Sequence, residues 1–304
     1  MHHNWQLARR QPAIKKRARI LHQIRAFFFN QGFLEVETPH RIPVNAPESA
    51  IEAVASGDWF LHTSPELCMK RLLAAGYDKI YQICRCWRAH ERGARHLPEY
   101  TMLEWYHRGC DYRQLMRDCE QLLRFLTEGR EKIHWQGHSL DLTLPWPRLT
   151  MTEAFDRYSS IPLKKISCPD HLSERISTDI EPNLPKNKPV FLVDYPSLQG
   201  SLARPKADDP AFVERFELYL GGMELANGFS ELTDPQEQHR RFQHEEALRR
   251  AAGKAPLPLP EPFLKDLEHL GCAAGIALGI DRLVMILCDA STIDDIVCFT
   301  PEQT

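Results

Sequence analysis

The chain of 304 residues lacks the features that define several classes of protein. It has no run of about 18 apolar residues, which excludes a membrane-spanning helix and predicts no membrane partner. No apolar segment followed by a cleavage site opens the sequence, so we expect no secretory signal. The formal net charge of −3 argues against a general affinity for nucleic acid. With 43% hydrophobic and 26% charged residues, the composition is that of a globular protein.

Two nucleotide-binding motifs are also missing. The sequence contains neither the phosphate-binding loop GxxxxGK(S/T) nor the dinucleotide-binding turn GxGxxG. Any ATP site must therefore be built by a different device.

The nine cysteines show no framework spacing, and their number is odd. Free thiols in a reducing cytoplasm fit this pattern best. Zinc is an alternative for Cys84, Cys86, His90 and His96. Structural zinc sites favour two to four residues between paired cysteines, whereas one residue intervenes here, and an extended hairpin would spread the four side chains apart. The spacing therefore argues against zinc on these four residues.

Acidic residues are absent from positions 1–34, which carry seven cations. These are Arg9, Arg10, Lys15, Lys16, Arg17, Arg19 and Arg25. The favoured interpretation is a solvated helix face, and the alternative is a docking surface for an acidic partner.

The hydrophobic periodicity indicates an α+β fold with antiparallel hairpins and separate helices. Helices are predicted at 12–30, 65–75, 111–129, 151–158, 235–252 and 280–287. Strands are predicted at 33–39, 59–63, 81–88, 99–106, 191–196, 216–220, 223–226 and 275–279.

The hairpin 81–106 carries the first cluster of chemical groups. Because side chains alternate along a strand, Tyr100, Met102, Glu104 and Tyr106 share one face. Arginines in and before the loop, with a glutamate on the second strand, predict a polyphosphate at one end and an amine at the other. An ordinary hairpin with a charged solvent face is the alternative.

The second cluster lies at 224–231. Asn227 and Glu231 share a strand face, whereas Glu224 has the opposite parity unless Gly228 supplies a bulge. With the bulge, the two glutamates would converge and hold a magnesium ion or an ammonium group. A polar hairpin without function is the alternative.

The third cluster runs from 275 to 282. Small residues at Gly275, Ala277 and Gly279 allow a flat ligand to approach the backbone. Arg282, at the start of the next helix, adds a cation, and Asp281 is a natural partner for a cap or an arginine.

These clusters, in this order, resemble the signature motifs of class II aminoacyl-tRNA synthetases. Segments 33–39, 88–100 and 279–282 resemble the first, second and third motifs, and segments 63–66, 98–106 and 227–231 resemble the lysine branch. The resemblance implies the class II catalytic fold, an antiparallel six-stranded sheet flanked by helices, and a homodimer.

The first core helix is expected by about residue 12, which leaves no room for an anticodon-binding OB domain. We therefore expect a single catalytic domain over residues 1–304. The chain resembles stand-alone paralogues of the lysine branch, which activate (R)-β-lysine with ATP and Mg²⁺. These enzymes transfer the aminoacyl group to a lysine of elongation factor P rather than to tRNA.

The resemblance also implies roles for individual residues. Catalysis would involve Arg88, Arg282 and Glu231. ATP would contact Arg88, Ala89, His90, Leu97, Tyr100, Glu224, Leu225, Gly279 and Arg282. The amino acid would contact Ser64, Glu66, Glu104, Tyr106, Asn227, Glu231 and Ala277. Magnesium would lie near Glu224 and Glu231.

Departures from the family pattern leave rivals open. The second motif has Ala89-His90 where the family has x-Glu, with Glu91 one place late, and Leu97 replaces an asparagine. Ala277 replaces a glycine of lysyl-tRNA synthetases, as expected for a β-amino acid. The rivals are a truncated lysyl-tRNA synthetase that charges tRNA or activates α-lysine, a non-catalytic regulator, and an amide-forming ligase of the asparagine synthetase kind.

Overall fold

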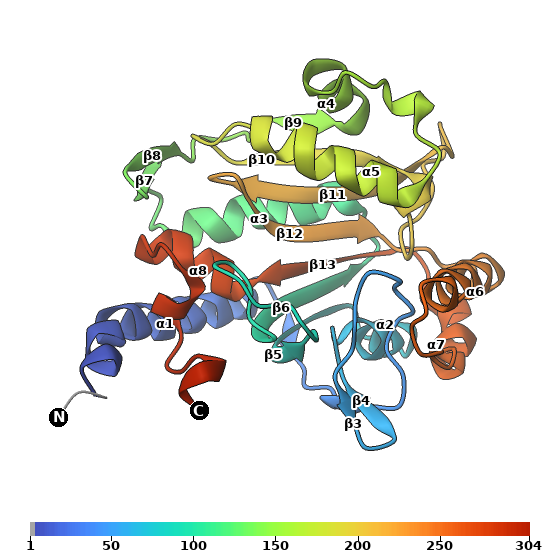
Figure 1. Cartoon of the computed structure of the whole chain (residues 1–304), viewed down its shortest axis with the longest axis horizontal. Coiled ribbons are helices and arrows are strands. Elements are labelled where there is room, and N and C mark those ends of the chain that lie inside the picture. Colours follow the sequence, from blue (N-terminus) through green and yellow to red (C-terminus); the bar gives the residue numbers. More distant parts are fainter. Residues whose placement is uncertain (1–3) are drawn as a thin grey trace.

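An eight-stranded mixed sheet forms the centre of the protein, which the computed structural model describes over residues 4–304. The strand order is β1-β5-β6-β13-β12-β11-β10-β9 (Figure 1). The six central strands are β5 (Lys79–Trp87), β6 (Glu99–Arg108), β13 (Ala273–Gly279), β12 (Met223–Ser230), β11 (Phe212–Leu220) and β10 (Val190–Pro196). Each of their five pairings is antiparallel, as the resemblance implied.

The two edge strands correct the expectation of a purely antiparallel, six-stranded sheet. β1 (Leu34–Glu35) pairs parallel to β5, and β9 (Arg148–Thr150) pairs parallel to β10. The predicted strand 33–39 shrinks to two residues, and β9 spans three. Strands this short leave little periodic signal in the sequence.

Helices α1 (Asn4–Asn30), α3 (Tyr112–Leu126) and α8 (Ile280–Cys288) pack on one face of the sheet and share its main core. The alternation along β6 explains the arrangement. Leu103 and Trp105 are fully buried on this face, and the rings of Phe28 and Trp105 lie 5.3 Å apart. Glu104 and Tyr106 point to the opposite face, where the cleft lies.

The remaining helices surround the cleft side. α2 (Glu66–Ala74), α6 (Pro235–Ala251) and α7 (Glu261–Asp266) cluster near a small three-stranded sheet (Figure 1). α4 (Met151–Tyr158) and α5 (Pro169–Arg175) cover the β9–β10 end of the main sheet. Two further small sheets comprise β2 (Arg41–Ile42), β3 (Ala55–Ser56) and β4 (Trp59–Leu61), and β7 (Lys132–Trp135) and β8 (His138–Asp141). The helix α5, followed by the π-helical turn Ile176–Ile180, was not predicted.

The first helix starts earlier than predicted, at Asn4 rather than near residue 12, and it contains Pro12. Four of its cations contact the rest of the protein. These are Arg10, Lys16, Arg17 and Arg25. Arg17 is the most engaged, because its Nη1 lies 2.5 Å from Asp281 Oδ1 and its Nη2 donates to Thr101 Oγ1 at 2.8 Å. The basic segment is therefore partly a structural anchor, rather than only a solvated face. Across residues 4–304, no helix has the length and apolar character needed to cross a membrane.

Candidate active site

A cleft of about 570 Å³ opens over the face of the sheet formed by β6, β13, β12 and β11. Its volume lies in the range of small-molecule sites. Thirteen of the predicted residues line it: Ser64, Glu66, Arg88, Leu97, Tyr100, Glu104, Tyr106, Glu224, Leu225, Asn227, Ala277, Gly279 and Arg282. Ala89, His90 and Glu231 do not line it.

One end of the cleft is acidic. The Ser64 hydroxyl donates to Glu104 Oε1 at 2.6 Å, and the Tyr106 hydroxyl donates to Glu104 Oε2 at 2.8 Å. Burial and the charge of Glu66 raise the pKa of Glu104 to about 8, although the two hydroxyl donors oppose this shift. A carboxylate held in this way is stabilised by any cation that enters the cleft.

Lys70 is a residue of this end that sequence reasoning missed. It lies on α2, where its Nζ is 2.6 Å from Glu66 Oε1 and 2.5 Å from Glu231 Oε2. Burial lowers the pKa of Lys70, but the charges of Glu231 and Glu66 outweigh this and the net shift is upward. A helical lysine is normally exposed. The sequence feature that could have indicated its burial is its position among Leu67, Met69 and Leu73, which are buried on the same helix.

The charges at this end do not cancel. Glu66, Glu104 and Glu231 contribute three negative charges when ionised, and Lys70 contributes one positive charge, which leaves −2. Burial also raises the pKa of Glu231 to about 8, opposed by Lys70. The acidic end is therefore built to receive positive charge, and two ammonium groups would neutralise it.

The predicted convergence of Glu224 and Glu231 is not found. The bulge lies at Leu225, because Leu218 pairs with Ala226 and Tyr219 with Glu224, whereas the pairing runs evenly through Gly228. The bulge turns Glu224 to the cleft, but Glu231 follows the far end of β12, about 20 Å away at the usual strand rise. One ion cannot bridge the two carboxylates.

Gly228 has a different role from the predicted one. A side chain there would meet the Phe216 ring at 2.9 Å and Ile276 at 3.0 Å. The glycine therefore allows close packing beneath the cleft and does not supply the bulge.

The other end of the cleft carries cations. Arg282 Nη1 donates to the Glu224 carbonyl at 2.8 Å and lies 3.2 Å from Glu224 Oε2, and its Nη2 contacts His96 Nε2. Burial, then the nearby Arg282 charge, lowers the pKa of His96. The guanidinium of Arg88 lies 5.4 Å from the centre of the Tyr100 ring. Two arginines from different elements thus converge on the same space.

The loop after β5 shows how the altered second motif is accommodated. His90 adopts a left-handed backbone conformation, with φ of 67°, and its side chain is exposed. Glu91 lines the cleft instead, with its Oε1 3.8 Å from Arg88 Nη1. Leu97 is only 4% exposed and joins the main core as well as lining the cleft. The glutamate one place late therefore occupies the cleft, and Ala89 and His90 do not.

Two charged residues of β11 in the cleft were also missed. Arg215 Nε donates to Asn227 Oδ1 at 3.2 Å, and Arg215 Nη2 lies 2.6 Å from Glu217 Oε1. The arginine holds the amide of Asn227 with its NH₂ group available to donate to a ligand. The alternation of Arg215, Glu217 and Tyr219 with apolar neighbours was the signal that could have revealed them.

This sheet carries a cleft with cations at one end and carboxylates at the other. Together, the sheet and the cleft define a ligase of the class II synthetase type. A family model described as tRNA synthetases class II (D, K and N) matches residues 3–303, and the chain belongs to this family. It is an enzyme of the ATP-dependent ligase class.

Two kinds of ligase are among the relatives of this chain. The chain is 36% identical to the elongation factor P–(R)-β-lysine ligase of Erwinia tasmaniensis, over 99% of this chain and 98% of that protein. It is 37% identical to the ligase of the same name from Pectobacterium carotovorum, with the same coverage. It is also 37% identical to the lysine–tRNA ligase of Moorella thermoacetica, over 93% of this chain but only 64% of that protein's length.

Proposed function

We propose that this protein activates (R)-β-lysine with ATP and transfers the β-lysyl group to a lysine side chain of elongation factor P. The observation that carries this proposal is the distribution of charge in the cleft. The acidic end gathers three carboxyl groups around one fixed ammonium and suits a substrate with two ammonium groups, and the arginines at the other end suit a triphosphate. Relatives with this activity in their names match along nearly their whole length.

In the first step, a carboxylate oxygen of the substrate bonds to the α-phosphorus of ATP, and the bond to the leaving pyrophosphate breaks. Arg88 and Arg282 neutralise the charge that builds up between the two anions. Glu224 lines the same end of the cleft and offers the hard oxygen donors that Mg²⁺ prefers. Bound there, the ion would screen the phosphate charges, whereas the buried Glu231 would not contact it.

Substrate recognition would rest on Glu66, Glu104 and Asn227. Glu66 and Glu104 accept from the two ammonium groups, and the Asn227 amide, oriented by Arg215, donates to the substrate carboxylate. Lys70 holds Glu66 and Glu231 in place through two ion pairs. These groups act by positioning, since holding two reactants in line removes much of the entropic barrier.

In the second step, the ε-amine of the acceptor lysine bonds to the carbonyl carbon of the adenylate. The carbon–oxygen bond to AMP breaks, and the amine loses a proton to solvent or to the departing phosphate. No nucleophilic side chain of the enzyme is needed. The homodimer and the single-domain organisation stay predictions.

The test is the intact mass of elongation factor P after incubation with the enzyme, ATP, Mg²⁺ and either (R)-β-lysine or α-lysine. We expect a gain of one lysyl residue that is larger with the β-isomer. Arg282→Ala should abolish the gain, whereas Arg240→Ala, at an exposed site on α6, should leave it unchanged. No gain with either isomer would overturn the proposal.

A second candidate is supported by the lysine–tRNA ligase relative. In this alternative, the chain activates α-lysine and charges tRNA. Lysine-dependent exchange of pyrophosphate into ATP, together with acid-precipitable lysyl-tRNA, would favour it. Ala277 pairs with both Glu104 and Asn227, so its methyl group lies where the substrate backbone is expected. This methyl group, in place of the glycine of lysyl-tRNA synthetases, argues for the β-isomer.

A further inference from the structure

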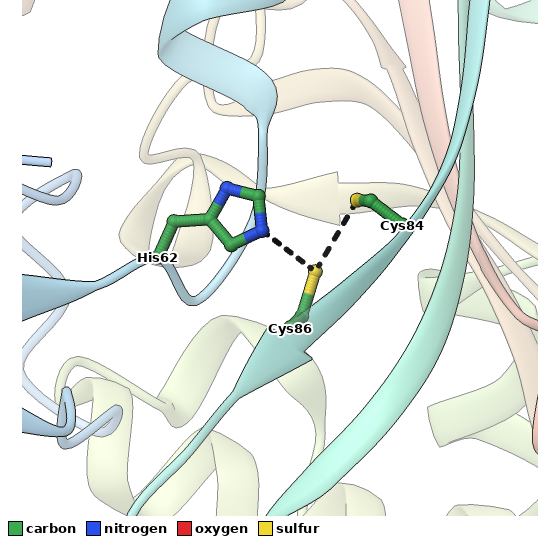
Figure 2. Close-up of side chains that lie close together, drawn as sticks. All are labelled: His62, Cys84 and Cys86. Carbon is green, nitrogen blue, oxygen red and sulfur yellow. Dashed lines mark hydrogen bonds between the residues drawn. The ribbon is translucent and has the colours of Figure 1, made fainter. Parts of the chain in front are cut away.

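A second cluster of chemical groups lies beside the cleft and is not used by the proposed reaction. His62, Cys84 and Cys86 bring one ring nitrogen and two sulfurs within 4.8 Å of one another (Figure 2). The two sulfurs are 3.8 Å apart, and Cys86 Sγ is 3.8 Å from His62 Nε2. All three side chains are buried, with exposed fractions of 1%, 6% and 0%.

Strand geometry explains this convergence. Cys84 and Cys86 are two residues apart on β5, so both thiols project from the same face. His62 follows β4 and is brought to them because its backbone carbonyl accepts from the Trp87 amide at 3.0 Å. Close cysteine spacing therefore gathers the two thiols instead of separating them. His90 and His96, the other residues considered for zinc, take no part in the cluster.

We propose that His62, Cys84 and Cys86, with a water molecule as the fourth ligand, form a zinc site that stabilises one side of the cleft, a role beyond the proposed function. Two thiolates bound to a tetrahedral zinc ion at about 2.3 Å each are separated by about 3.8 Å. The observed separation of the sulfurs is 3.8 Å. Soft thiolate ligands with an imidazole favour zinc over magnesium or calcium.

Binding requires a defined exchange of protons and hydrogen bonds. Two thiol protons leave for solvent as two sulfur–zinc bonds form. The Nε2 of His62 lies 2.6 Å from the Arg85 carbonyl, so it must give up this hydrogen bond and present its lone pair to the ion. The ring proton then resides on Nδ1. Zinc binding should therefore be linked to pH.

The location gives the site a structural role. Met102 pairs with Cys84 and Tyr100 pairs with Cys86 across β5 and β6, and both of these side chains line the cleft. His62 precedes Thr63 and Ser64, and Ser64 donates to Glu104. An ion at the cluster would fix this segment to β5 on the cleft side of the sheet, and thereby hold the serine against the carboxylate.

The first experiment measures zinc per chain after incubation with excess Zn²⁺ and gel filtration through a weak chelator. We expect about one zinc per wild-type chain, and at least a tenfold weaker affinity in His62→Gln and Cys86→Ser. The matched control is Cys288→Ser, a partly buried thiol on α8, which should bind as wild type does. Equal zinc content in wild type and Cys86→Ser would overturn the proposal.

The second experiment uses the wild-type protein alone, so that it does not depend on the folding of a variant. Titration with Co²⁺ should produce visible d–d bands of tetrahedral intensity and near-ultraviolet thiolate-to-cobalt charge transfer. Excess Zn²⁺ should remove both. The absence of charge-transfer absorption at saturating Co²⁺ would also overturn the proposal, whatever the activity of the enzyme.

Discussion

Lys70 and Glu231 form an ion pair in which Nζ lies 2.5 Å from Oε2 and the side chains are only 2% and 0% exposed. The lysine also forms an ion pair with Glu66, so one fixed ammonium lies between two carboxylates beneath the acidic end of the cleft. A buried pair of this kind is costly to break, because either partner alone is an uncompensated charge.

We predict that Lys70→Met lowers the free energy of unfolding by about 3–5 kcal/mol, the usual cost of removing one partner of a buried pair. Urea-induced unfolding would measure it. The control is Arg71→Met on the same helix, whose exposed pair with Asp266 should contribute less than about 1 kcal/mol. Similar losses in the two variants would contradict the assigned role of Lys70.

Glu104 should make the stability of the ligand-free protein depend on pH. Burial and Glu66 raise its pKa to about 8 in the folded state, above the ordinary value of 4.5. The folded state therefore holds the proton more tightly, and this contribution to stability is full below pH 4.5, falls as the pH rises from there, and is lost above about 8.

The comparison of wild type with Glu104→Gln isolates this contribution. Denaturant unfolding at pH 5.5, 7 and 8.5 should show the stability of wild type falling relative to the variant as the pH rises. The glutamine resembles the protonated carboxyl at every pH. Parallel pH profiles would show that Glu104 ionises normally.

Arg17 should be essential to the packing of the first helix. Its guanidinium joins Asp281 to Thr101, and both partner side chains are buried. We expect Arg17→Met to cost about 3 kcal/mol or more, in line with broken buried pairs. The exposed Arg19, changed to methionine in the same helix, should cost little. Thermal unfolding of both variants would measure the difference, and equal melting temperatures would refute the role of Arg17.

Ala277 should discriminate between the isomers of lysine. Its methyl group lies on the cleft floor between Glu104 and Asn227, where the backbone of the substrate is expected. We predict that Ala277→Gly shifts the ratio of kcat/KM toward α-lysine by about tenfold or more, as one methyl group commonly does. Pyrophosphate exchange with each isomer would measure it.

Ala274→Gly controls for the loss of a methyl group from the same strand. Ala274 is fully buried in the main core on the opposite face, so this change should alter stability and leave the isomer ratio as it was. A ratio that is unchanged in Ala277→Gly would show that another residue selects the isomer.

Much of the fold was accessible from the sequence because its central strands alternate clearly. The hairpin turn at Gly221–Gly222 and the faces of β6 were predicted correctly. β9, α5 and its π-helical turn were not predicted, and β1 spans only two residues of the predicted strand 33–39, since two- and three-residue strands carry no period and residues 163–184 mix short turns.

The site was only partly accessible for a different reason. Residues of one strand face can be grouped by parity, which placed Tyr100 and Glu104 together. Lys70 becomes visible only when α2 is packed against the sheet, because its pairing with Glu231 spans 161 positions of the chain. His62 likewise lies 24 positions before Cys86 and reaches the two cysteines only in the folded chain, so the sequence grouped the cysteines with His90 and His96 instead.

The bulge at Leu225 has a consequence for how the chain can vary. Glu224 and Asn227 are three positions apart and yet face the same way, because the bulge places one extra residue between them. In a regular strand of the same length, Glu224 would point away from the cleft although every amino acid type of the motif would still be in place. The backbone conformation at Leu225 therefore matters as much as the chemistry of the motif, and a change that straightens the strand without shortening it would be as harmful as the loss of the glutamate.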